Sequence, residues 1–78
     1  SSNVEPVPST ITVQEVARIA LVEANQFITD AKDKGIDPSS VIETLTKAKM
    51  AYNNKEYKQA QKYAVSVRKQ VEKLMTEK

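Results

Sequence analysis

The sequence predicts an all-α fold, an antiparallel three-helix bundle in residues 11–78. Three observations lead to this prediction. Apolar residues recur every three or four positions in three successive segments, which is the spacing of amphipathic helices. Helix start and stop signals separate the segments, and no strand-like alternation competes with them. The two connections are short, so successive helices should run antiparallel.

Residues 1–10 read SSNVEPVPST and are expected to form an extended linker. Pro6 and Pro8 cannot sit inside a helix, and each proline favours extended geometry in the residue before it. We therefore expect a semi-rigid spacer ahead of the bundle.

The first helix is predicted over about residues 12–34. Thr12 is a favourable N-cap residue, and Glu15 stands three positions later, as in a capping box. Ile11 and Val16 occupy the two positions of a hydrophobic staple across this cap. The apolar residues then form one stripe that is broad enough to contact two neighbouring helices. They include Ala17, Ala20, Leu21, Ala24, Phe27, Ile28 and Ala31.

The end of this helix is marked by Gly35, the only glycine in the chain. Glycine adopts left-handed backbone angles without a steric penalty, so it commonly closes a helix. Ile36 follows it and is placed to fold back toward Ala31. This combination predicts a Schellman ending.

The second helix is predicted over about residues 38–53. Asp37 can cap its start, and Pro38 suits a first turn, where no amide hydrogen is needed. Asn53 and Asn54 are expected to end it, because asparagine tolerates turn geometry. Its buried side should comprise Val41, Ile42, Leu45, Ala48, Ala51 and Tyr52.

The third helix is predicted over about residues 55–76. Its apolar residues alternate by three and four throughout, as in the seam of a helical bundle. They are Tyr57, Ala60, Ala64, Val67, Val71 and Leu74. The lysines fall mostly on the opposite side, at Lys55, Lys58, Lys62, Lys69 and Lys73.

The composition excludes several kinds of chemistry. The chain has no Cys and no His, so it forms no disulfide and no zinc or haem site built on those ligands. The commonest catalytic base and nucleophile are missing too, so we predict no enzymatic activity and no cofactor. Asp30, Asp33 and Asp37 do not match the spacing of a calcium loop and are expected to be solvated or capping acids. No apolar run approaches the roughly 20 residues that span a membrane, so we expect no membrane insertion.

The charges are distributed unevenly along the chain. Residues 1–46 hold three basic and seven acidic residues, a sum of −4, whereas residues 47–78 hold nine basic and three acidic residues, a sum of +6. The first interpretation is that an acidic first helix lies near a basic last helix. The alternative is a basic surface that meets an acidic partner.

The predicted contact face for a partner protein is Tyr63 with Lys58, Lys62 and Lys69. Tyr63 lies off the apolar seam, whereas the other two tyrosines are expected to pack the helical hairpin with their hydroxyls at its rim. The lysines could instead meet the phosphates of a nucleic acid. The scarcity of arginine argues against specific reading of bases.

The stretch AKMAYNNKEYKQAQKYAVSV resembles the middle of a tetratricopeptide repeat. Ala48 falls on the small position of the first helix in that family, and Tyr57 and Ala60 fall on the turn-flanking aromatic and the small contact position of the second. The stretch departs from the family at Lys55, where a turn glycine is usual, and at Ala64, where an aromatic is usual. It is also similar to helical-hairpin modules of multidomain prokaryotic and archaeal surface proteins, and to microtubule-interacting-and-transport domains. Each resemblance implies a non-enzymatic binding or spacer role.

These observations predict a non-catalytic accessory module of a larger protein. It would bind another protein or space neighbouring domains of the same chain. The alternative is a small domain that binds polyanions or nucleic acid through the basic side of the third helix. Weak self-association is a further prediction, because the alanine-rich seam of that helix permits close approach of a second copy.

Overall fold

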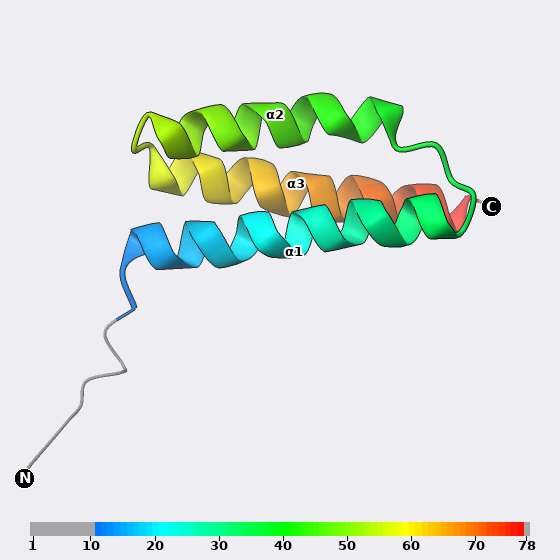
Figure 1. The fold of residues 1–78 in the computed structure, drawn as a ribbon, viewed down its shortest axis with the longest axis horizontal. Helices are drawn as coiled ribbons and strands as arrows, with labels where there is room; N and C mark the ends of the chain where they lie inside the picture. Colours follow the sequence, from blue (N-terminus) through cyan, green and yellow to red (C-terminus); the bar gives the residue numbers. More distant parts are fainter. Residues whose placement is uncertain (1–10, 78) are drawn as a thin grey trace, which may run out of the picture.

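The structure is a computed structural model that describes residues 11–77. It contains three α-helices: α1 (Val13–Asp33), α2 (Ser39–Asn53) and α3 (Tyr57–Thr76). The helices run alternately in opposite directions (Figure 1), and residues 11–77 contain no strand. The prediction of an all-α, antiparallel three-helix bundle is therefore confirmed. The expected linker, residues 1–10, lies outside the described residues.

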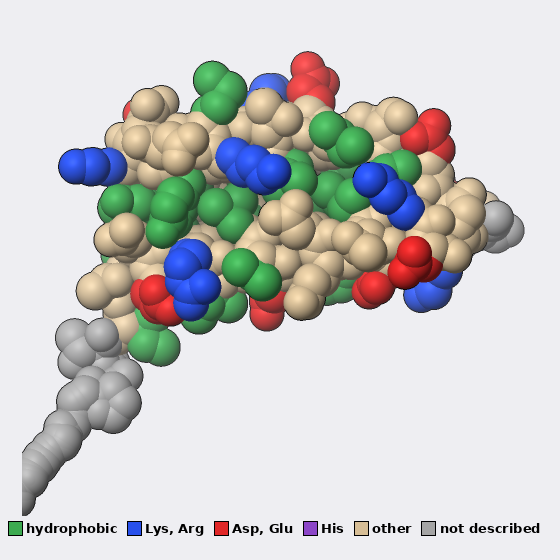
Figure 2. Space-filling view, in the orientation of Figure 1, with side chains coloured by type: hydrophobic (Ala, Val, Ile, Leu, Met, Phe, Trp, Pro, Cys, Tyr) green, Lys and Arg blue, Asp and Glu red, His purple; other side chains and the backbone are tan. Residues whose placement is uncertain are grey.

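Helix α3 occupies the central place in the bundle. It packs along both α1 and α2, which contact each other much less. The surface seen in Figure 2 belongs mainly to α1 and α2. Hydrophobic side chains lie along the line between these two helices, and several Lys and Arg side chains lie over or beside them. None of the helices in residues 11–77 is long and apolar enough to cross a membrane.

The core consists of small and branched apolar side chains. No polar or charged side chain is buried among residues 11–77. The apolar ring of Pro38 is buried as well. Seven of the twelve buried core residues are alanines, whose small side chains allow neighbouring helices to pack closely. The buried residues are Ala17, Ala24, Ile28 and Ala31 of α1; Val41, Leu45, Ala48 and Ala51 of α2; and Ala60, Ala64, Val67 and Val71 of α3.

Thr12 caps the start of α1 as predicted. Its Oγ1 accepts a hydrogen bond from the amide of Glu15 at 3.1 Å. The carboxylate of Glu15, however, accepts hydrogen bonds from the guanidinium of Arg18, with Nε at 3.1 Å, rather than reaching back to the cap. Ile11 stays 59% exposed, so the expected staple with Val16 buries little of its side chain.

The predicted Schellman ending of α1 is confirmed. Gly35 has a φ of +79°, in the left-handed region that favours glycine. The amide of Ile36 donates to the carbonyl of Ala31 at 2.9 Å, and the amide of Gly35 donates to the carbonyl of Lys32 at 3.0 Å. These two bonds define the motif. The side chain of Ile36 then packs against the core.

The N-cap position of α2 is occupied by Pro38 rather than by Asp37. Asp37 stabilises the first turn from one residue earlier. Its Oδ1 accepts hydrogen bonds from the amide of Ser39 at 3.0 Å and from the hydroxyl of Ser39 at 2.6 Å. The helix itself begins at Ser39, one residue after the expected start at Pro38, because Pro38 has a ψ of 11° and lies just outside the helical geometry.

The turn between α2 and α3 differs from the expectation. Helix α2 ends at Asn53, as predicted, and Asn54 is its C-cap residue with a φ of −86°. The left-handed residue is instead Lys55, with a φ of +66°. A residue in this conformation cannot continue a right-handed helix. Helix α3 therefore begins at Tyr57 rather than at Lys55.

This turn is a second Schellman ending. The amide of Glu56 donates to the carbonyl of Ala51 at 2.8 Å, and the amide of Lys55 donates to the carbonyl of Tyr52 at 2.9 Å. The pattern repeats the one at the end of α1, with lysine in place of glycine.

Candidate partner-binding face

Three of the four predicted contact residues lie together on the outer side of α3. Lys58, Lys62 and Lys69 line one shallow depression, with Gln61, Val65 and Ser66 between them. We call these three lysines the lysine face. All three side chains are exposed. The core-facing residues of α3 occupy the opposite side of the helix, so its packing directs the lysines into solvent.

No acidic side chain forms an ion pair with the lysine face within the part of the chain that the structure describes. The one ion pair found in residues 11–77 joins Glu15 and Arg18, both on α1. Helix α1 does lie beside α3, as the uneven charge distribution predicted. The lysines of α3 nevertheless form no ion pair with it, so their charge is presented outward.

The structure separates the fourth predicted residue, Tyr63, from the lysine face. Consecutive residues of a helix are about 100° apart around its axis, so Tyr63 turns away from Lys62 toward α2. There it is half-buried and packs against the cluster of Ala17, Ala51 and Ala60. It lines a separate depression between α2 and α3, next to the exposed side chain of Met50.

Tyr52 and Tyr57 pack the hairpin as predicted. Their rings meet edge to face, with centroids 5.3 Å apart and an interplanar angle of 66°. The hydroxyl of Tyr52 accepts a hydrogen bond from Nε2 of Gln14 at 3.5 Å, which links the hairpin to α1. These two rings are half-buried and contribute to packing at the α2–α3 turn.

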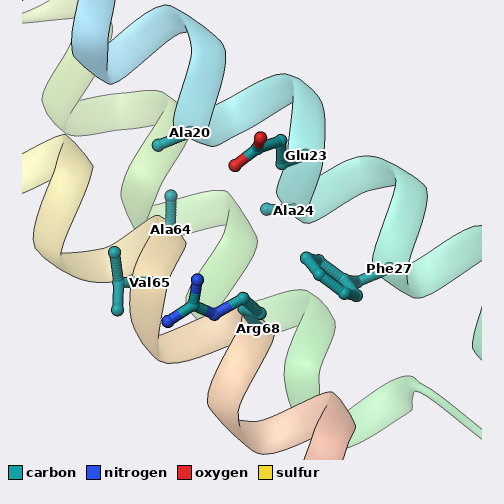
Figure 3. Close-up of a pocket in the computed structure, with 7 residues that line it drawn as sticks. All are labelled: Ala20, Glu23, Ala24, Phe27, Ala64, Val65 and Arg68. Carbon is teal, nitrogen blue, oxygen red and sulfur yellow. The ribbon is translucent and has the colours of Figure 1, made fainter.

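A small cleft lies between α1 and α3, and the sequence did not indicate it. Figure 3 shows Glu23 and Phe27 of α1 on one side, with Val65 and Arg68 of α3 on the other. Its floor is formed by Ala20, Ala24 and Ala64. The volume is about 20 Å³, which has room for little more than one water molecule. Facing alanines on both helices are the sequence signal that could have located it.

The cleft connects an acidic and a basic surface. Val65 lines both the cleft and the depression of the lysine face. On the other side, Glu23 lines both the cleft and an adjoining depression that also includes Asp30 and Arg68. We call Glu23 and Asp30 the acidic row.

The groups with perturbed titration lie elsewhere, at helix starts. The hydrogen bond from Arg18 lowers the pKa of the Glu15 carboxyl, and the same contact raises the pKa of Arg18. The hydroxyl and then the amide of Ser39 lower the pKa of Asp37 by hydrogen bonding to its carboxylate. All three groups are exposed. In residues 11–77, no three acidic side chains gather closely enough to hold a metal ion.

Comparison of the chain with models of protein families, with curated proteins and with solved structures gave no match. The resemblance to tetratricopeptide repeats therefore stays a prediction.

Proposed function

We propose that this domain is a non-catalytic accessory module of a larger protein, and that its lysine face binds an acidic surface of a protein partner. The supporting observation is a row of exposed lysines that have no acidic partner in residues 11–77. From Lys58 to Lys69 the row extends for about 16 Å along the helix. Such a row attracts an oppositely charged surface and orients it during encounter.

A protein partner suits this face better than a nucleic acid. The depression of the lysine face is lined by no aromatic side chain and no arginine. Tyr63 faces α2, and Arg68 lies in the cleft. Aromatic stacking stabilises the binding of single strands, and arginine is the commonest reader of bases. Binding of polyanions by lysine charge alone is the alternative, and it would weaken steeply as salt rises.

A spacing role is the second candidate, and it is supported by the odd number of helices. The start of α1 and the end of α3 lie at opposite ends of the bundle (Figure 1). The 21 residues of α1 correspond to a length of about 31 Å. Domains joined at the two ends would be held apart by roughly this distance.

The test of the binding proposal is a titration with a glutamate-rich peptide and, separately, with a single-stranded oligonucleotide. We expect the peptide to bind, and the triple variant Lys58→Gln, Lys62→Gln, Lys69→Gln to bind it at least about tenfold more weakly. A matched control replaces three lysines of α1 and α2 by glutamine, at Lys32, Lys47 and Lys49. The control should bind like the parent chain. The proposal would be contradicted if the chain bound only the oligonucleotide, or if both triple variants lost peptide binding to the same extent.

A further inference from the structure

We propose that the side of the bundle formed by α1 and α3 binds a second copy of this chain, as a symmetric dimer. This proposal deepens the proposed function and rests on it: the acidic surface that meets the lysine face is the acidic row of another copy.

Three stripes run side by side along this surface. The acidic row of α1 comes first, the cleft with Phe27 and Val65 comes second, and the lysine face of α3 comes third. The order follows from shared lining residues, since Glu23 joins the acidic row to the cleft and Val65 joins the cleft to the lysine face. Figure 3 shows the two helices flanking the cleft. One surface thus carries both halves of a complementary charge pattern.

The charge pattern selects one symmetry. A two-fold axis that runs along the cleft, parallel to the helices, places the acidic row of each copy opposite the lysine face of the other. An axis across the cleft would place acidic row on acidic row and lysine on lysine. Like charges that face each other are strongly unfavourable. Two-fold dimers are also the commonest form of protein self-assembly.

The centre of this surface has the composition expected of an interface. Phe27 and Val65 are half-buried, and the second copy would cover the part of each side chain that is still exposed. Charged residues surround them, as in the polar rim of protein interfaces. Three charges do not follow the stripes. Arg68 lines the cleft opposite Glu23, and Lys34 follows Asp30 by four residues at the end of α1. Glu72, seven residues after Val65, is the single acidic residue of α3.

The expected dimer is weak. Helices pack 8–10 Å apart, so two adjacent helices of this length offer on the order of 500 Å² per copy. Stable interfaces bury about 800 Å² per partner. Exposed charge pairs also contribute little each and are screened by salt. We therefore expect dimers at high protein concentration and low ionic strength.

The first experiment is sedimentation velocity on the chain, from micromolar concentration to about 1 mM, in about 50 mM and about 300 mM NaCl. We expect a monomer–dimer equilibrium whose dissociation constant rises at least about tenfold in the higher salt. The acidic-row variant Glu23→Gln, Asp30→Asn should weaken the dimer by a similar factor. The triple lysine variant at Lys58, Lys62 and Lys69 should do the same.

The control variant of Lys32, Lys47 and Lys49 should dimerise like the parent chain, and Glu72→Gln should dimerise more tightly. Circular dichroism establishes that each variant is folded. Equal weakening by the control variant, or weakening by Glu72→Gln, would overturn the assigned surface.

The second experiment tests the symmetry. A carbodiimide couples a carboxylate directly to a lysine amine that touches it. In an equal mixture of isotopically light and heavy chains, we expect mixed-isotope links between the acidic row of one copy and the lysine face of the other. Mixed links elsewhere, or products larger than a dimer, would overturn the two-fold arrangement.

The experiments distinguish failure of the dimer from failure of the proposed function. The acidic-row variant keeps its lysines, so it should still bind the glutamate-rich peptide. A chain that binds this peptide but stays monomeric at about 1 mM overturns the dimer and leaves the proposed function standing. A chain that does neither overturns both.

Discussion

Replacing Lys55 by glycine should stabilise the bundle. Lys55 has a φ of +66°, which brings the Cβ of any L-residue too close to the following carbonyl oxygen. Its side chain is exposed and makes no ion pair in residues 11–77. Glycine therefore relieves the clash without losing a packing contact, and both hydrogen bonds of the Schellman turn are kept.

The magnitude follows from two opposing terms. The left-handed conformation costs an L-residue roughly 1–2 kcal/mol, and glycine avoids this cost. Glycine also loses more backbone entropy on folding, which costs about 0.5–1 kcal/mol. The net gain lies between about 0 and 1.5 kcal/mol. The midpoints of the two terms differ by ~0.75 kcal/mol, which raises the Tm of a domain of this size by roughly 3–6 °C.

Thermal unfolding followed by circular dichroism measures this gain. Lys47→Gly is the matched control, because Lys47 is an exposed lysine inside α2. Glycine there should lower stability by about 1 kcal/mol. Lys55→Ala should change little, since alanine keeps the unfavourable Cβ. If Lys55→Gly lowers the Tm or leaves it unchanged, the argument from the backbone angle is refuted.

Three further predictions concern the cap, the core and pH. Thr12→Ala removes the acceptor for the Glu15 amide. It should lower the free energy of unfolding, measured by urea denaturation, by about 1 kcal/mol. Ala60→Leu overfills the fully buried contact with Ala17 and Ala51 and should cost about 1–3 kcal/mol, seen as a lower Tm. Asp37 has a pKa lowered from 3.8 in the folded state. The ionised carboxylate of Asp37 therefore stabilises the folded state fully above pH 3.8, and this stabilisation is lost as the pH falls through the lowered pKa. The parent chain should therefore lose more stability on acidification below about pH 4 than Asp37→Asn, measured by urea midpoints across pH.

Local chemistry explains why much of the fold could be predicted from the sequence. Thr12 and Asp37 are short polar side chains that accept amide hydrogens at helix starts, and both do so in the structure. Gly35 closes α1 because only its left-handed angle satisfies both bonds of that ending. In each case the determining contact lies within a few residues along the chain.

The parts that could not be predicted depend on contacts made elsewhere. Lysine has no preference for a left-handed angle, so nothing in its side chain indicated that Lys55 rather than Asn54 would adopt it. In the structure this angle closes the Schellman turn through which α3 folds back along α2. The position of Tyr63 off the seam predicts that it joins the lysines, but which neighbouring helix covers that side depends on the three-dimensional arrangement. The cleft beside Phe27 likewise exists only once α1 and α3 meet.

The up-down-up order of the helices determines how the domain would respond to tension. The chain enters α1 at one end of the bundle and leaves α3 at the other. These two helices are parallel in direction and pack side by side. A pull on both ends would drag α1 and α3 past each other in shear. Unfolding under force would then require the apolar contacts along the whole length of both helices to break together. In a simple helical hairpin pulled from its two adjacent ends, these contacts break one turn after another.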